Sequence, residues 1–253
     1  MLKHRVIPCL LLKNGGLVKT KKFQDPKYVG DPINVIRIFN DKEVDELIVL
    51  DIEASKAKRK PNYELIEQFA GECFMPLCYG GGISSVEQAK RLFALGVEKV
   101  CIQTRALADL QLVRDIAERY GSQSVVVSVD IKKNLFGSYR LYSSSTEKML
   151  ELPWQDFLNR VVAAGAGEIM LTAVDRDGTL TGMDLALIRT ASQSCPIPVI
   201  AAGGAATLSD LRAAVDAGAS AIAAGAMFIF HGPHRAVLIT YPQYNDLVSL
   251  LDK

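Results

Sequence analysis

The chain has 253 residues, of which 49% are hydrophobic, and a formal net charge of +1 at pH 7. That length and apolar content are enough for one large buried core, whereas a nearly neutral chain offers no basic surface for nucleic acid. Because charged residues or glycines interrupt every hydrophobic run and the first residues show no signal pattern, we expect a cytoplasmic protein with neither a membrane nor a nucleic-acid partner.

Short apolar segments alternate with amphipathic ones along the first half of the chain. The predicted strands are residues 5–12, 46–52, 77–79 and 99–103. The predicted helices begin at Pro32 and near Asn62 and span residues 86–95 and 110–120. Residues 18–31 contain four lysines, and we expect a long polar loop there, a feature that is usually functional or disordered.

The second half of the chain repeats this alternation. Its predicted strands are residues 124–130, 168–172 and 198–202 and a last strand that ends at Gly225. Helices are predicted after Trp154, from Leu185, over residues 208–215 and over residues 244–251, with polar loops at 131–152 and 173–184. Eight strands that alternate with about eight helices over this length predict one α/β domain, residues 1–253, folded as a (β/α)₈ TIM barrel.

An internal repeat divides the chain into two halves. The strand, helix and strand at residues 198–226 match those at residues 76–104, so that Gly203, Gly204 and Gly218 each lie 122 positions after a glycine of the first unit (203 against 81, for example). The same offset relates the apolar strands at 46–50 and 168–172. A repeat over nearly half of the chain predicts two fused half-barrels.

Glycines follow two equivalent strands of this repeat, as Gly80-Gly81-Gly82 and as Gly203-Gly204. Bare backbone N–H groups beside helix N-termini bind anions, so we expect a phosphate pocket after each strand, completed by Thr104 and by Gly225. The two pockets together predict one phosphorylated small-molecule ligand with a phosphate at each end. The alternative is that the glycines only permit tight turns between strand and helix.

Aspartates at the ends of strands are the candidate acid–base groups, since active sites of such barrels lie at the carboxyl ends of the strands. Asp130 ends the strand at 124–130, where a carboxylate can move protons on a bound sugar or amine. Asp51, Asp175 and Asp177 lie at or just beyond the ends of two other strands. An aspartate in a loop often only stabilises a turn, so a partner carboxylate would strengthen the assignment.

Charged residues of both signs begin four strands at the opposite end of the predicted barrel, namely Arg5, Glu46, Lys99 and Glu168. We expect these side chains to form a ring of ion pairs that closes the bottom of the barrel. Features at this end of a TIM barrel usually concern stability.

The cysteine and histidine patterns predict neither a metal nor a cofactor. The five cysteines include no C-x-x-C pair, which favours buried free thiols. Gly232 and Pro233 separate His231 from His234, which favours a surface turn over a pair of metal ligands. Pro233 and Pro242 also predict an irregular helix after the last strand.

Five segments carry a resemblance to a known family, and they are Cys9-Leu10, Gly80-Gly81-Gly82-Ile83, residues 122–127, Asp175-Arg176-Asp177-Gly178-Thr179 and Ala202-Gly203-Gly204-Ala205. Together they resemble the cyclase subunit of imidazole glycerol phosphate synthase. The likeness runs from Met1 to about Phe228, and the segment at 175–179 is its most specific part.

The resemblance implies a barrel that binds a bisphosphorylated ribulosyl aminoimidazole carboxamide nucleotide and receives ammonia from a glutaminase at its N-terminal face. The four bottom charges match the family's ammonia gate, Glu98 matches an acidic contact to the glutaminase, and Asp130 matches one of two catalytic aspartates. Lys19 matches a lysine of the loop that covers the substrate. The candidate substrate- or phosphate-binding residues are therefore Lys19, Gly81, Gly82, Thr104, Asp177, Gly203, Gly204, Ala224 and Gly225.

The second catalytic aspartate of the family is absent from this chain. Where the family pattern is Cys-Leu-Asp-Val-Lys-Asp-Gly, this chain has Leu11 in place of the first aspartate, and Gln103 stands where asparagine is usual. Leucine cannot exchange a proton, so ring closure by two carboxylates would require Asp51 or another group as a substitute.

A barrel with the gate and both anion pockets but only one acid resembles the paralogues found with surface-polysaccharide genes. In those paralogues the barrel and a glutaminase are thought to supply ammonia that turns an acetamido sugar into an acetamidino sugar during lipopolysaccharide biosynthesis. Residues 231–239 look like that subgroup. We therefore expect a lyase- or cyclase-type subunit of a glutamine amidotransferase complex with this role.

Three alternatives are open. The chain could be a histidine-pathway cyclase that makes imidazole glycerol phosphate from the ribulosyl nucleotide, or a non-catalytic conduit for ammonia. The sister isomerase of the histidine pathway shares the repeat and the two phosphate sites, but the segment at 175–179 and the bottom charges fit the cyclase better.

Overall fold

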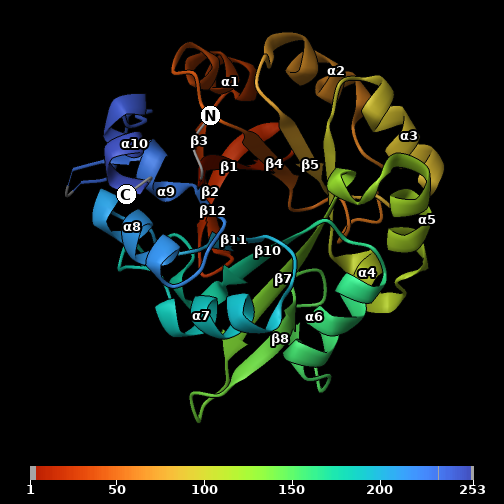
Figure 1. The fold of residues 1–253 in the computed structure, drawn as a ribbon. Helices are drawn as coiled ribbons and strands as arrows, with labels where there is room; N and C mark the ends of the chain where they lie inside the picture. Colours follow the sequence, from red (N-terminus) through yellow and green to blue (C-terminus); the bar gives the residue numbers. More distant parts are fainter. Residues whose placement is uncertain (1–3, 233, 252–253) are drawn as a thin grey trace.

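A computed structural model describes residues 4–232 and 234–251. Within these residues eight parallel strands close into a barrel, which confirms the predicted (β/α)₈ fold (Figure 1). In ring order the barrel strands are β1 (Arg5–Lys13), β4 (Leu47–Asp51), β5 (Leu77–Gly80), β6 (Lys99–Ile102), β7 (Val125–Lys133), β10 (Glu168–Ala173), β11 (Val199–Ala202) and β12 (Ala221–Ala224). The ring closes because β12 pairs with β1 and β7 pairs with β10.

Helices surround the barrel (Figure 1). They are α1 (Pro32–Asp41), α2 (Tyr63–Glu72), α3 (Val86–Ala94), α4 (Thr104–Ala108), α5 (Gln111–Tyr120), α6 (Trp154–Ala163), α7 (Leu185–Ser194), α8 (Leu208–Asp216), α9 (Ala226–Ile229) and α10 (Tyr244–Leu251). Two 3₁₀ turns, η1 (Ser122–Ser124) and η2 (Val174–Arg176), precede β7 and follow β10. Asn62 explains the start of α2, because its Oδ1 accepts a hydrogen bond from Leu65 N at 3.2 Å.

Side chains on the barrel strands alternate between the inside of the barrel and the layer beneath the helices. On β1, Ile7 and Cys9 belong to an apolar cluster inside the barrel, whereas Val6 and Leu10 belong to the core between strands and helices. The inner cluster consists of Ile7, Cys9, Ile48, Cys78, Cys101, Val126, Met170, Ile200, Ala202, Ala221 and Ala223. The middle of the barrel is therefore filled with apolar atoms.

Two segments that were predicted to be loops form β-hairpins instead. In place of the loop at 18–31, β2 (Gly16–Lys21) pairs with β3 (Gln24–Gly30). In place of the loop at 131–152, β7 continues and pairs with β8 (Tyr139–Ser143), which pairs with β9 (Lys148–Met149). The first hairpin turns at Lys22 and Phe23, whose φ angles are 55° and 64°. Such turns usually contain Asn-Gly, so the sequence gives no turn signal there.

The segment after β12 is irregular, as Pro242 predicted. Helix α9 has only four residues and is followed by a short pair of strands, β13 (Phe230–His231) and β14 (Ala236–Val237). Pro233, which supported the same prediction, lies outside the described residues, and His231 and His234 are exposed on either side of it. Arg235 fastens this segment to the loop after β10, because its Nη2 donates to the carbonyl oxygens of Gly178 and Thr179, both at 3.2 Å.

The cysteines are free thiols, as predicted; four are buried and Cys73 is half-buried. Across residues 4–232 and 234–251, no group of three or more His, Cys, Asp or Glu side chains could hold a metal ion. No helix in those residues is long and apolar enough to cross a bilayer.

Gly178→Ala is expected to detach the β2–β3 hairpin from the loop after β10. A Cβ atom at this position would lie 1.9 Å from Thr20 O, and a φ of +65° is unfavourable for alanine. Hydrogen exchange of residues 16–30, followed by mass spectrometry, should accelerate. Gly137→Ala is the matched control, because its φ is +80° but no atom lies within 4 Å of the added Cβ. Unchanged exchange in the Gly178 variant would contradict this account.

Candidate active site

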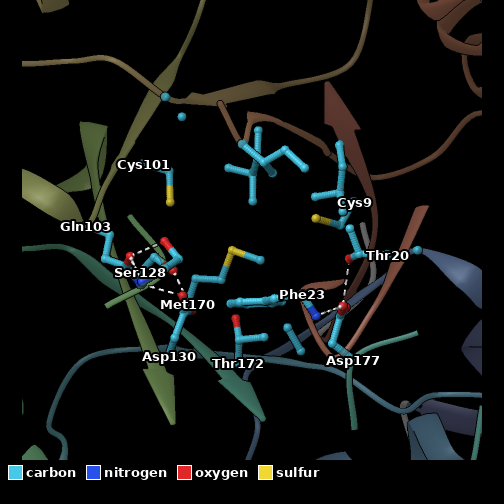
Figure 2. Close-up of a pocket in the computed structure, with 18 of the residues that line it drawn as sticks. Cys9, Thr20, Phe23, Cys101, Gln103, Ser128, Asp130, Met170, Thr172 and Asp177 are labelled. Atoms are coloured by element: carbon cyan, nitrogen blue, oxygen red, sulfur yellow. Dashed lines mark hydrogen bonds between the residues drawn. The ribbon is translucent and has the colours of Figure 1, made fainter. Parts of the chain in front are cut away.

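The carboxyl ends of the barrel strands open into a cavity of about 510 Å³. Its walls also include the β2–β3 hairpin and the turn between β8 and β9, and Figure 2 shows Asp130 and Asp177 among its lining side chains. The ten residues predicted for proton transfer or ligand binding at this end all line it, namely Lys19, Gly81, Gly82, Thr104, Asp130, Asp177, Gly203, Gly204, Ala224 and Gly225. The fold therefore brings both halves of the repeat to one cavity.

The two glycine turns lie on opposite sides of this cavity, since β5 and β11 are four strands apart in the ring. A Cβ atom at Gly81 would lie 2.5 Å from Asp51 O, and one at Gly203 would lie 2.7 Å from Ala173 O. Close packing therefore requires both glycines whether or not an anion binds. The expectation of bare amides is wrong for Gly82, because its N–H donates to the Ser55 hydroxyl at 3.3 Å.

Lys19 points from the β2–β3 hairpin to Gly225, which directly follows β12. Its Nζ donates to Cys9 O at 2.5 Å, and a Cβ atom at Gly225 would lie 2.2 Å from that same Nζ. The side chain is buried, and burial lowers the pKa of Lys19. Since its ammonium group makes no ion pair with a carboxylate in the part of the chain that the structure describes, a bound anion would be a favourable partner for it.

Asp130 is 3% exposed at the end of β7 and accepts hydrogen bonds from neighbouring side chains (Figure 2). Gln103 Nε2 donates to its Oδ2, and Ser128 Oγ donates to its Oδ1 at 3.1 Å. Burial raises the pKa of Asp130 to about 6, while hydrogen bonds from Gln103, Ser128 and Thr172 act in the opposite direction. A carboxyl with this pKa can both accept and return a proton near neutral pH.

Leu11 lies on the far wall of the cavity from Asp130, because β1 and β7 are four strands apart in the ring. Asp51, the candidate substitute acid, is engaged in a turn. Its Oδ1 accepts from Glu53 N at 3.0 Å and from Ala54 N at 2.9 Å. It therefore stabilises the connection after β4, as loop aspartates often do.

The two aspartates after β10 also hold backbone segments in place. Asp177 Oδ2 accepts from Thr20 Oγ1 at 2.9 Å and from Phe23 N at 3.4 Å, which fastens the β2–β3 hairpin. Asp175 Oδ2 accepts from Lys133 N at 2.7 Å, which fastens the end of β7. Asp177 lines the cavity from this position.

The four charges at the bottom of the barrel form a closed ring of ion pairs. Arg5 pairs with Glu46 through Nη1 and with Glu168 through Nη2 at 2.6 Å. Lys99 Nζ lies 3.0 Å from a carboxylate oxygen of each glutamate. Burial opposes the charge of Arg5, but Glu168 and Glu46 outweigh it and raise the pKa of Arg5. The predicted ring of ion pairs is present at this end.

Glu98 is exposed next to this ring and does not take part in it. Its backbone N donates to Leu77 O at 2.9 Å, which places it at the start of β6, on the same end of the barrel as Lys99. A partner that covered the ring would meet this carboxylate at the surface.

The sequence patterns did not identify the side chains that surround Asp130 and Asp177. Ser128 precedes Asp130 by two positions on β7, and Thr172 is its register partner on β10. The period of two along a strand, counted back from Asp130, identifies Ser128. Phe23 and Ser144 lie on segments that were predicted to be loops, and no motif marked them.

Comparisons with known proteins cover nearly the whole chain. Residues 5–234 match the family model described as histidine biosynthesis protein. The chain is 54% identical over 252 residues to a Pseudomonas aeruginosa protein provisionally named imidazole glycerol phosphate synthase subunit hisF2, with 98% of this chain and 99% of that protein covered. It is 44% identical over 257 residues to a Vibrio vulnificus protein provisionally named subunit hisF3, with 100% and 98% covered. It is 42% identical over 205 residues to imidazole glycerol phosphate synthase subunit HisF of Streptococcus sanguinis, with 81% of each covered.

Glu46→Gln is expected to destabilise the fold by about 3 kcal/mol, because it leaves two part-buried cations with one carboxylate. Denaturation in guanidinium chloride at pH 7 would measure the loss. Glu72→Gln is the matched control, since Arg37 and Glu72 pair on the surface, where an ion pair contributes little. The control should keep the denaturation midpoint of the wild type. Equal midpoints for the two variants would show that the ring of ion pairs does not stabilise the fold.

Proposed function

Because the chain belongs to the histidine biosynthesis protein family, as a HisF-like cyclase subunit of imidazole glycerol phosphate synthase, we propose that it works with a glutaminase partner. The glutaminase docks at the N-terminal face of the barrel and releases ammonia there. The barrel delivers this ammonia to a phosphorylated ligand in the cavity. Ammonia forms a bond to the carbonyl carbon of an acetamido group, the carbonyl oxygen leaves as water, and the product is an acetamidino group on a sugar of lipopolysaccharide.

The observation that carries this specialisation is Leu11 opposite Asp130. A cyclase of the two-aspartate kind has a second aspartate at the end of the first strand, and this chain has Leu11 there, across the cavity from Asp130. Positioned acid–base groups each contribute roughly 10²–10⁴ in rate, so loss of one is a large penalty for ring closure. A reaction that needs a single proton acceptor, such as removal of a proton from an attacking amine, is still within reach of Asp130.

The interior of the barrel supports the passage of ammonia. Above the ring of ion pairs the inner cluster consists of apolar and thiol side chains up to Met170 and Ala223. Neutral ammonia crosses such an interior at far lower cost than ammonium, because desolvation of a charge is expensive. Glu98, exposed beside the ring, supplies an acidic contact for the glutaminase.

The ligand is anionic at both ends in this proposal. Gly81, Gly82 and Thr104 bind one phosphate, and Gly203, Gly204, Ala224 and Gly225 bind the other, with Asp177 holding the hairpin over the cavity. Lys19 supports the second site, since its ammonium group lies beside Gly225, where it can pair with a bound phosphate. Asp130 lies between the two sites and moves the proton.

The rival function is an ordinary histidine-pathway cyclase, which the relatedness to HisF of Streptococcus sanguinis favours. With the ribulosyl aminoimidazole carboxamide nucleotide and ammonium chloride, Leu11→Asp should form imidazole glycerol phosphate at least about 100-fold faster than the wild type, because it restores the second carboxylate. Liquid chromatography of the product would measure this.

Leu50→Asp is the matched control for that experiment, because Leu50 also lines the cavity but on β4, not opposite Asp130. It should leave the slow wild-type rate unchanged. Wild-type turnover equal to that of Leu11→Asp would contradict the specialised function and would identify the chain as a histidine-pathway cyclase.

In a strain that lacks this gene, mass spectrometry of the surface polysaccharide should show acetamido sugars in place of acetamidino sugars. Complementation with Glu98→Lys should fail, because charge reversal removes the acidic contact to the glutaminase. Complementation with Asp130→Asn should also fail if the barrel is catalytic. Full restoration by Asp130→Asn, with failure of Glu98→Lys, would instead identify a conduit that carries ammonia without chemistry of its own.

A further inference from the structure

Gln103 connects two elements at the mouth of the barrel (Figure 2). Its Nε2 donates to Asp130 Oδ2 on β7. Its Oε1 accepts from Ser144 N at 3.2 Å and from the Ser144 hydroxyl, in the turn between β8 and β9. These three hydrogen bonds connect the amide to only two residues, Asp130 and Ser144.

The contact with the backbone of Ser144 fixes which way the amide points. A backbone N–H can only donate, so the atom of Gln103 that faces it must be the oxygen. The nitrogen then faces Asp130 and must donate. Rotation of the amide by 180° would set two donors against each other at Ser144 and two acceptors against each other at Asp130.

The turn that anchors Gln103 is itself held in place. Lys56 Nζ donates to Glu147 Oε1 at 2.5 Å, and the Ser143 hydroxyl accepts from Thr146 N at 3.4 Å. Ser144 and Glu147 line the cavity. The turn that contacts the Gln103 amide is therefore held in place by its own side-chain contacts.

Donors therefore converge on Asp130. The Nε2–H group of Gln103 can only donate a hydrogen bond. A protonated Oδ2 of Asp130 would need an acceptor and would lose this hydrogen bond, whereas an ionised Oδ2 accepts it. The titratable groups that face Asp130 from other elements are Asp177 after β10, Cys9 on β1 and Tyr142 on β8, and Asp177 favours the neutral acid. The amide opposes that effect.

We propose that Gln103 is a positioning residue, which Ser144 N holds with its donor toward Asp130 so that this carboxyl is kept in its proton-accepting form. The inference rests on the proposed function only in taking Asp130 as the group that moves the proton. It assigns to the turn between β8 and β9 an indirect part in proton transfer.

Titration of wild-type protein by NMR tests this without any substrate. The carboxyl carbon of Asp130 should titrate with a midpoint near 6, and the side-chain amide of Gln103 should shift with the same midpoint. Gln123 is the internal control, because its Nε2 donates to Tyr120 O, and its amide should not follow that titration. A Gln103 amide that is silent through the titration of Asp130 would overturn the proposal.

Two variants separate the donor from its anchor. Gln103→Met has similar length without a donor and should shift the titration midpoint of Asp130 upward by about one pH unit, because the hydrogen bond from Gln103 favours the ionised form. Ser144→Ala keeps the backbone N–H and should leave the midpoint near 6. An unchanged midpoint in Gln103→Met would contradict the proposal. Because no ammonia or polysaccharide enters this measurement, its failure is distinct from failure of the proposed function.

Discussion

The alternation of side chains along eight closed strands determines what this molecule presents at each level of its interior. Strand β10 carries Glu168 at the bottom, Met170 in the middle and Thr172 at the mouth, each two residues from the next. Pairing with β7 fixes the height of these residues, because Thr172 is in register with Asp130. The charged ring, the apolar middle and the proton-transfer group are therefore held at set heights by backbone hydrogen bonds.

The mouth is completed by elements that lie outside the plain repeat of strand and helix. Strands β1 and β7, which begin the two halves, each run on into an antiparallel hairpin. The first hairpin carries Lys19 to Gly225, and the segment after β8 carries Ser144 to Gln103. The two hairpins thus bring different side chains to the mouth, although the barrel strands of the two halves repeat.

The sequence was sufficient to predict the barrel and the residues at its two ends, because both follow from strand periodicity and from which residue ends each strand. It was insufficient for the hairpins, since positive φ at Lys22 and Phe23 is unusual for these residue types and left no turn motif to read. It also could not show that Asp51 is committed to the amides of Glu53 and Ala54, because such a contact depends on the path of the loop. The orientation of Gln103 depends on a backbone N–H from a distant turn, which no local pattern encodes.

The glycine at position 225 couples two parts of the chain that are far apart in sequence. A methyl group there would occupy the space in which the ammonium group of Lys19 now lies. Any larger residue directly after β12 would displace this ammonium group from its hydrogen bond to Cys9 O. A substitution at one of these two positions therefore limits which residues fit at the other. As such barrels diverge, we expect positions 19 and 225 either to change together or to stay unchanged.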